Sequence, residues 1–251
     1  MPQAPERPGD SGGQPVFFVP ASILAMLSLL LALHLTRTLL QPDMDQFTLV
    51  MLGVVPGKYM PGVTSAFPGG YWAALPALIS YAFLHANFTH LAINSAWLLA
   101  FGSMVVRKIG TVRFMMLYLL CALLAAIVHI LADFASLTPM VGASGAISGL
   151  MGAGFRIVLP GMMEGRGLYA DQGAIPGGGA PIRLAPLTDR RFLTMSGIWM
   201  GMNIVFGLTG IRVSEQVLLI AWDAHIAGFI AGALLIGIFT RQKNVSGVTQ
   251  S

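Results

Sequence analysis

Residues 142–160 read GASGAISGLMGAGFRIVLP, a run of small and apolar residues that carries a single charge, Arg156. A helix needs about 20 mostly apolar residues to cross the hydrocarbon core of a bilayer, and this run has about that length. The rest of the chain agrees, because 55% of its 251 residues are hydrophobic and only 10% are charged, against about 25% charged in soluble domains. The sequence therefore predicts a membrane protein.

Five further stretches have the length and hydropathy of membrane-spanning helices. The sequence thus predicts an all-α polytopic protein with six spans, at residues 16–36, 87–106, 113–132, 142–160, 192–211 and 217–239. They form a membrane domain over residues 16–241, with residues 161–191 as a flexible cytoplasmic loop. We expect residues 1–15 to be a disordered cytoplasmic tail and residues 242–251 a second cytoplasmic tail.

The distribution of positive charge predicts the orientation. With the N-terminus inside, eleven Lys and Arg residues fall in the inner segments and three fall in the outer ones, namely Arg37, Lys58 and Arg212. Inner loops of membrane proteins carry the excess of Lys and Arg, so we expect both termini to face the cytoplasm. The N-terminal residues lack the character of an organelle transit peptide, which favours a bacterial inner (plasma) membrane.

Several function classes are disfavoured. The pI is about 9.6, but no dense basic stretch with interleaved aromatic residues indicates nucleic-acid binding. The glycine-rich loop lacks the Lys-Ser/Thr pair of a phosphate-binding loop. The single Cys121 excludes an intrachain disulfide, and no histidine-carboxylate cluster has metal-ligand spacing. We therefore predict neither a metal nor another cofactor.

Polar residues within spanning segments are costly and usually functional. His90 and Asn94 are four residues apart and share one helix face. These two residues, Ser144 and His225 each lie in the N-terminal third of the second, fourth or sixth span. Because these three spans run in the same direction, the four side chains are expected at a similar depth below the outer surface.

Small residues favour close contact between the fourth and sixth spans. Glycines repeated at helical spacing let two backbones approach closely, which is expected to bring Ser144 within hydrogen-bond reach of His225. The fourth span carries Gly145, Gly149 and Gly152, and the sixth carries Gly228 and Gly232.

The remaining intramembrane ionisable groups have simpler interpretations. His34 and His129 lie near the outer ends of their spans, where a side chain that snorkels to the interface explains them. Asp223 is two residues from His225, about 200° around a helix. We therefore expect Asp223 to be an interfacial or capping residue and favour a Ser-His dyad over a triad.

These four polar residues supply the groups that acyl transfer needs. A serine is a weak nucleophile until an adjacent base takes its proton, and His225 can do this for Ser144. The tetrahedral intermediate needs preorganised donors around its oxyanion. The Asn94 amide, a His90 nitrogen and backbone N–H groups at the start of the fourth span are the candidates.

At these residues the chain resembles the rhomboid family of intramembrane serine proteases. The resemblance covers about residues 16–241 and implies a six-helix rhomboid-like bundle. It implies that Ser144 is the nucleophile, His225 the base, and His90 and Asn94 the oxyanion ligands, with His85 in a supporting role. The implied substrates are transmembrane proteins, cleaved in the bilayer near its outer face. The residues that carry the resemblance are His85, His90 and Asn94; Gly142, Ser144, Gly145 and Gly149; and Ala224, His225, Gly228 and Gly232.

The chain departs from the family pattern at two points. Many members have an aromatic residue four positions after the serine, where this chain has Ser148. The Trp-Arg pair of the first outer loop is also missing. Two other function classes are weighed against the protease. One is a catalytically inactive rhomboid-like chaperone or adaptor, although such relatives usually lose the serine or the histidine. The other is a six-span transporter, although the chain has no duplicated half.

Overall fold

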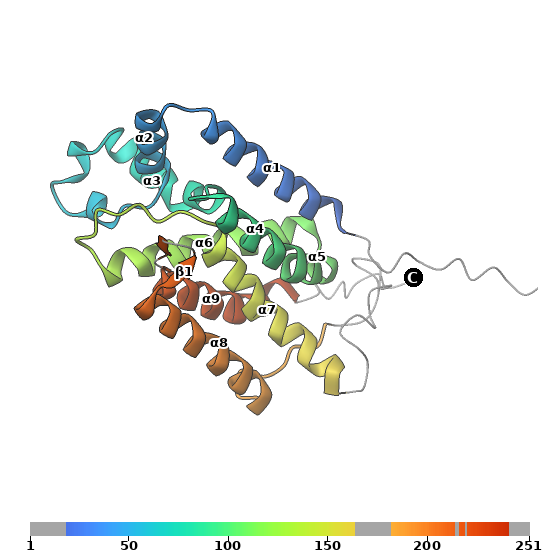
Figure 1. Ribbon diagram of the computed structural model, residues 1–251. Helices are drawn as coiled ribbons and strands as arrows, with labels where there is room; N and C mark the ends of the chain where they lie inside the picture. Colours follow the sequence, from blue (N-terminus) through green and yellow to red (C-terminus); the bar gives the residue numbers. More distant parts are fainter. Residues whose placement is uncertain (1–18, 164–181, 214–215, 219, 241–251) are drawn as a thin grey trace, which may run out of the picture.

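The computed structural model describes residues 19–163, 182–213, 216–218 and 220–240. Within them, six helices are long and apolar enough to cross a membrane, as the sequence predicted (Figure 1). The second span is one continuous rod built from α4 (Phe88–Trp97), the π-helical turn η4 (Leu98–Gly102) and α5 (Ser103–Ile109). The other five are α1 (Ala21–Thr38), α6 (Thr111–Ala132), α7 (Ser144–Met163), α8 (Arg190–Thr209) and α9 (Trp222–Thr240).

The starts of two spans differ most from the prediction. The first span begins at Ala21, directly after Pro20. The sixth begins at Trp222 rather than at residue 217, because strands β1 (Ile211–Val213) and β2 (Gln216–Leu218) pair antiparallel just before it. The apolar residues of β2 extend the apolar run of the sixth span in the sequence, but their backbone is not part of helix α9. The predicted tails, residues 1–15 and 242–251, lie outside the described residues, as do residues 164–181 of the predicted loop.

The segment between the first two spans is folded. It contains α2 (Pro42–Leu52), α3 (Gly70–Ser80) and the short helices η1 (Pro56–Tyr59), η2 (Thr64–Ala66) and η3 (Tyr81–Phe83). The fully buried Lys58 donates from Nζ to the carbonyl of Val50 at 2.6 Å, at the end of α2 where helix carbonyls lack partners. Burial lowers the pKa of Lys58. Backbone hydrogen bonds between Val54 and Met140, 2.7 and 3.0 Å long, join this segment to the chain that leads into α7.

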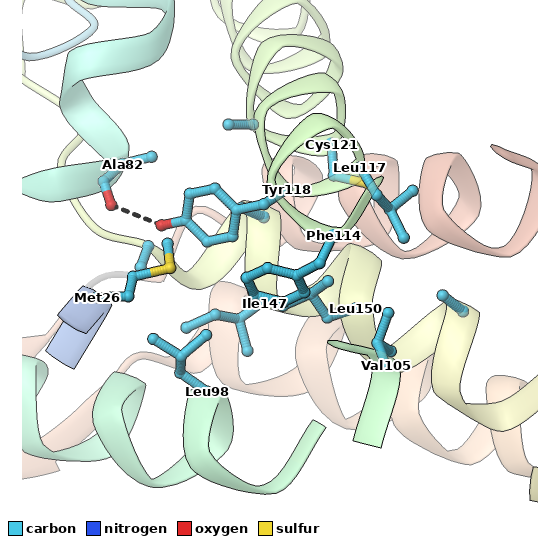
Figure 2. Packing of buried hydrophobic residues seen from close by; sticks show 14 of the residues in the cluster. Met26, Ala82, Leu98, Val105, Phe114, Leu117, Tyr118, Cys121, Ile147 and Leu150 are labelled. Atoms are coloured by element: carbon cyan, nitrogen blue, oxygen red, sulfur yellow. Dashed lines mark hydrogen bonds between the residues drawn. The ribbon is translucent and has the colours of Figure 1, made fainter. Parts of the chain in front are cut away.

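Helix α7 lies at the centre of the bundle. Two thirds of its span (67%) is buried, the largest share of the six spans. Figure 2 shows Ile147 and Leu150 of α7 against Phe114 of α6. In the same core the hydroxyl of Tyr118 donates to the carbonyl of Ala82 at 2.9 Å. The core therefore joins α6 and α7 to the end of the segment between the first two spans, directly beside the start of α7.

Candidate active site

Ser144 and His225 meet at one end of the bundle. Ser144 is the first residue of α7, and His225 lies in the first turn of α9. Oγ of Ser144 lies 2.7 Å from Nε2 of His225, a hydrogen-bond distance between groups that are 81 residues apart in the sequence. Both side chains are half-buried. A serine hydroxyl with its proton directed at an imidazole nitrogen is the arrangement in which histidine acts as a base.

Glycine contacts between α7 and α9 produce this approach. A Cβ atom on Gly228 would overlap the carbonyl oxygen of Gly145, and one on Gly232 would overlap that of Gly149. A Cβ on Gly152 would likewise overlap the carbonyl of Phe229. The two backbones are therefore in direct contact over successive turns, in agreement with the small-residue packing expected from the sequence.

His90 and Asn94 lie on α4 beside the residues that precede Ser144. The Asn87 side chain caps this helix by accepting from the His90 backbone N–H at 2.8 Å. Gly142 has a φ of +130°, a conformation that favours glycine. A Cβ built on Gly142 would lie 2.7 Å from Nε2 of His90 and 3.6 Å from Nδ2 of Asn94. Only glycine leaves the His90 ring room at this point, while Asn94 lies at ordinary contact distance.

The Asn94 amide has an unused donor. Its Nδ2 atom is buried and has no hydrogen-bond partner among the described residues. A buried donor without a partner costs free energy and is uncommon in folded proteins. The start of α7 adds further donors, because the first N–H groups of a helix have no acceptor within it. Several N–H groups are therefore available to an acceptor near Ser144.

The side chain of His85 packs against the ring of His90. The two rings meet edge to face with centroids 5.2 Å apart, and the His85 side chain is fully buried. The carbonyl of His85 accepts from the Arg37 guanidinium at 2.7 Å, and Arg37 also pairs with Asp45 at 2.7 Å. Burial lowers the pKa of His85 to about 3, with His90 adding to the effect. The ring is therefore neutral at physiological pH.

The structure shows what surrounds the other two histidines of the spans. His34 is buried and packs edge to face on Phe88, with ring centroids 4.5 Å apart. Nδ1 of His129 pairs with the Asp223 carboxylate at 2.8 Å, joining α6 to α9. The snorkelling interpretation is therefore wrong for His34. Asp223, expected to be an interfacial or capping residue, lies in the first turn of α9 and is also the partner of His129.

One polar residue of the site was missed by the sequence analysis. Asn203 of α8 places its Oδ1 atom 2.8 Å from Nδ1 of His225. Its Nδ2 atom donates to the carbonyl of Trp199 at 2.9 Å, one turn earlier on the same helix. The available signal was an asparagine within an apolar span, six residues before the C-terminal end of α8. Asn203 lies in the fifth predicted span, which runs opposite to the second, fourth and sixth, so the shared depth of the polar residues in those three spans did not include it.

Among the described residues, no group of three or more His, Cys, Asp or Glu side chains is arranged to hold a metal ion. Cys121 is buried in the core beside Gly149. Ser148, the residue in place of the family's aromatic, is also buried in α7.

Comparisons with known proteins agree with this architecture. The Rhomboid domain family matches residues 69–242. A stretch of 76 residues is 38% identical to RHOMBOID-like protein 5 of Arabidopsis thaliana, covering 30% of this chain and 25% of that protein. A stretch of 86 residues is 37% identical to Rhomboid protease GluP of Bacillus subtilis (strain 168), covering 34% and 15%. These stretches thus span a quarter or less of each relative, whereas the family match spans more than half of this chain. The chain therefore belongs to the rhomboid family of integral, multi-pass membrane proteins.

Proposed function

We propose that this protein is an intramembrane serine endopeptidase that hydrolyses peptide bonds of membrane-anchored proteins near the outer membrane face. The observation that carries the proposal is the 2.7 Å contact between Oγ of Ser144 and Nε2 of His225. The family match and the relative named as a protease support the same reaction class. The orientation with both termini in the cytoplasm, and the location in a bacterial inner membrane, remain predictions from the sequence.

Acylation begins when Oγ of Ser144 attacks the carbonyl carbon of the scissile peptide bond. Nε2 of His225 takes the hydroxyl proton as the new C–O bond forms, and the carbonyl oxygen becomes an oxyanion. When the tetrahedral intermediate collapses, the C–N bond breaks and the imidazolium gives its proton to the leaving amine. Water then attacks the acyl-serine by the same route, with His225 again accepting and returning a proton.

The oxyanion is stabilised by donors that the fold already holds in place. The buried Nδ2 of Asn94 lacks a partner among the described residues, so an arriving oxyanion satisfies it. His90 lies beside it against Gly142 and is the second candidate donor. Donors fixed before the reaction stabilise developing charge without reorganising.

Cleavage and active-site labelling by the purified protein test this proposal. We expect wild type to cleave a model transmembrane substrate and to react with a serine-directed fluorophosphonate probe. Ser144→Ala should do neither. Ser148→Ala is the matched control, because it removes a buried hydroxyl from the same helix one turn away, and it should remain active. Probe labelling that persists in Ser144→Ala, or the lack of any cleavage by wild type, would contradict the proposal. The second of these results would favour a rhomboid-like chaperone or adaptor.

A further inference from the structure

We propose that Asn203 is a positioning residue for catalysis: its amide oxygen holds His225 in the tautomer and orientation that let Nε2 accept the Ser144 proton. This inference rests on the proposed function. It assigns the third member of a Ser-His-Asn arrangement to α8, whereas Ser144 is on α7 and His225 on α9.

Two hydrogen bonds determine how the Asn203 amide is turned. An asparagine amide has one accepting and one donating end, and the bonds around it show which is which. Nδ2 of Asn203 lies 2.9 Å from the carbonyl oxygen of Trp199, which only accepts. Oδ1 therefore faces His225, 2.8 Å from Nδ1.

The tautomer of His225 follows from this orientation. A neutral imidazole has one N–H donor and one accepting nitrogen. Because Oδ1 of Asn203 only accepts, the proton must be on Nδ1, and the lone pair on Nε2 faces the Ser144 hydroxyl. In the opposite tautomer, the lone pair of His225 Nδ1 would face a lone pair of Asn203 Oδ1, which is unfavourable. When Nε2 takes the serine proton, the bond from Nδ1–H to Oδ1 is kept.

The fold holds Asn203 in place through its neighbours one turn away on each side. Trp199, Asn203 and Gly207 form one stripe on α8, because residues four apart share a helix face. Trp199 stacks on Phe229 of α9, with ring centroids 4.8 Å apart and planes at 20°. A Cβ on Gly207 would overlap the ring of Trp222, so this ring rests against the α8 backbone.

The rest of α8 makes few packing contacts with the other helices. Only 11% of the α8 span is buried, the smallest share of the six. The face that does meet α9 contacts Phe229, His225 and Trp222 in successive turns, and Asn203 is at its centre. Among the described residues, the carboxylate nearest in sequence to His225 is that of Asp223, and it is paired with His129. The side-chain amide of Asn203 therefore occupies the place that the acid has in a Ser-His-Asp triad. A neutral asparagine fills the same place in Cys-His-Asn proteases.

Kinetics of four purified full-length variants with a transmembrane model substrate test the inference. Asn203→Leu removes both hydrogen bonds, and Asn203→Ala repeats the test with a smaller side chain in case leucine prevents folding. Asn203→Asp retains an acceptor for Nδ1–H, and when protonated it also retains a donor to the Trp199 carbonyl. Ser196→Ala is the control, because it removes a buried hydroxyl from the same helix without touching His225.

We expect Asn203→Leu and Asn203→Ala to lose about 10- to 100-fold in kcat, as for one lost hydrogen bond in the reacting unit. Their KM should change less than about threefold, and fluorophosphonate labelling of Ser144 should slow in proportion to kcat. Asn203→Asp should recover most of the loss, and Ser196→Ala should match wild type. A wild-type kcat in the leucine or alanine variant would overturn the inference while leaving the proposed function intact. A change in KM without a change in kcat would also overturn the inference, as would an Asn203→Asp variant that is as slow as Asn203→Leu. An inactive wild type would instead overturn the proposed function, and this inference with it.

Discussion

Gly228 of α9 lies against the carbonyl oxygen of Gly145 of α7, with no room between them for a methyl group. One turn further along, Gly232 stands in the same relation to Gly149. Gly145 directly follows Ser144, and Gly228 is three residues after His225. The distance between the two backbones at this contact therefore sets the distance between Ser144 and His225.

Leucine at Gly228 should reduce activity more than stability. It must displace α9 from α7 or overpack the contact, at a cost of about 1–3 kcal/mol, while a shift of about 1 Å at the site can cost on the order of 10²-fold in rate. Cleavage and probe labelling of Ser144 should fall together, while thermal unfolding changes modestly. Gly149→Leu should behave in the same way.

Gly237→Leu is the matched control for this comparison. Gly237 is on the same helix, but a Cβ there would meet no atom within 4 Å. We expect this variant to retain wild-type kinetics. Equal activity in Gly228→Leu and Gly237→Leu would show that the glycine contact does not position the site.

Removing either member of the dyad should abolish proteolysis. Ser144→Ala lacks the proposed nucleophile and His225→Ala lacks the proposed base. Each variant should still insert in the membrane and unfold near the wild-type temperature. The double variant should be no slower than either single variant, because residues that act as one unit are not additive. Single-turnover assays with a transmembrane substrate measure this. Substantial cleavage by one of the single variants would remove that residue from the mechanism.

Asn94→Ala should slow the chemical step without removing it. Loss of one oxyanion donor typically costs about 10²–10³ in kcat, or roughly 3–4 kcal/mol. We expect this variant to fall in that range, and His90→Ala to be at least as slow because His90 also packs on His85 and Gly142. The measurement is kcat at saturating substrate. A wild-type rate in Asn94→Ala would assign this residue to packing alone.

Stability should decrease on mild acidification, and His85 should account for part of the decrease. Burial lowers the pKa of His85 to about 3, from an ordinary value of 6.5. Between these values the unfolded chain binds a proton that the folded protein does not, so the free energy of unfolding falls as pH falls. The slope is at most about 1.4 kcal/mol per pH unit.

Denaturant unfolding in detergent at pH 7, 6 and 5 checks this expectation. Wild type should lose more stability over this range than His85→Asn, by up to about 2 kcal/mol. Carboxylates stay largely ionised above pH 5, so they contribute little to the difference. If the free energy of unfolding fell equally with pH in wild type and in His85→Asn, His85 would bind a proton equally well in the folded and the unfolded state.

Chelators should leave the activity unchanged. The proposed reaction needs only the serine, the histidine and the oxyanion donors, and the described residues contain no metal-binding group of His, Cys, Asp or Glu. Cleavage rates with and without a chelator such as EDTA measure this. Loss of activity that zinc or another divalent ion restores would contradict it.

The number of spans and the glycine contact followed from the sequence alone. Burial of a helix in lipid requires a long apolar run, so hydropathy marks each span regardless of its neighbours. The exact helix ends did not follow, because the apolar residues of β2 resemble a helix start in hydropathy while their backbone pairs with β1.

The sequence by itself indicated the fold class and the pairing of Ser144 with His225, because hydropathy marks each span and the glycines that bring α7 and α9 together can be read from both. Only the tertiary structure decided what surrounds His225. Asp223 is close in sequence but turns to His129, while Asn203 lies 22 residues away and reaches Nδ1. Which side chain meets an imidazole depends on how two helices are rotated and aligned. That alignment arises from side-chain packing between helices, such as Trp199 on Phe229 and Trp222 on Gly207, which the hydropathy of either helix does not encode.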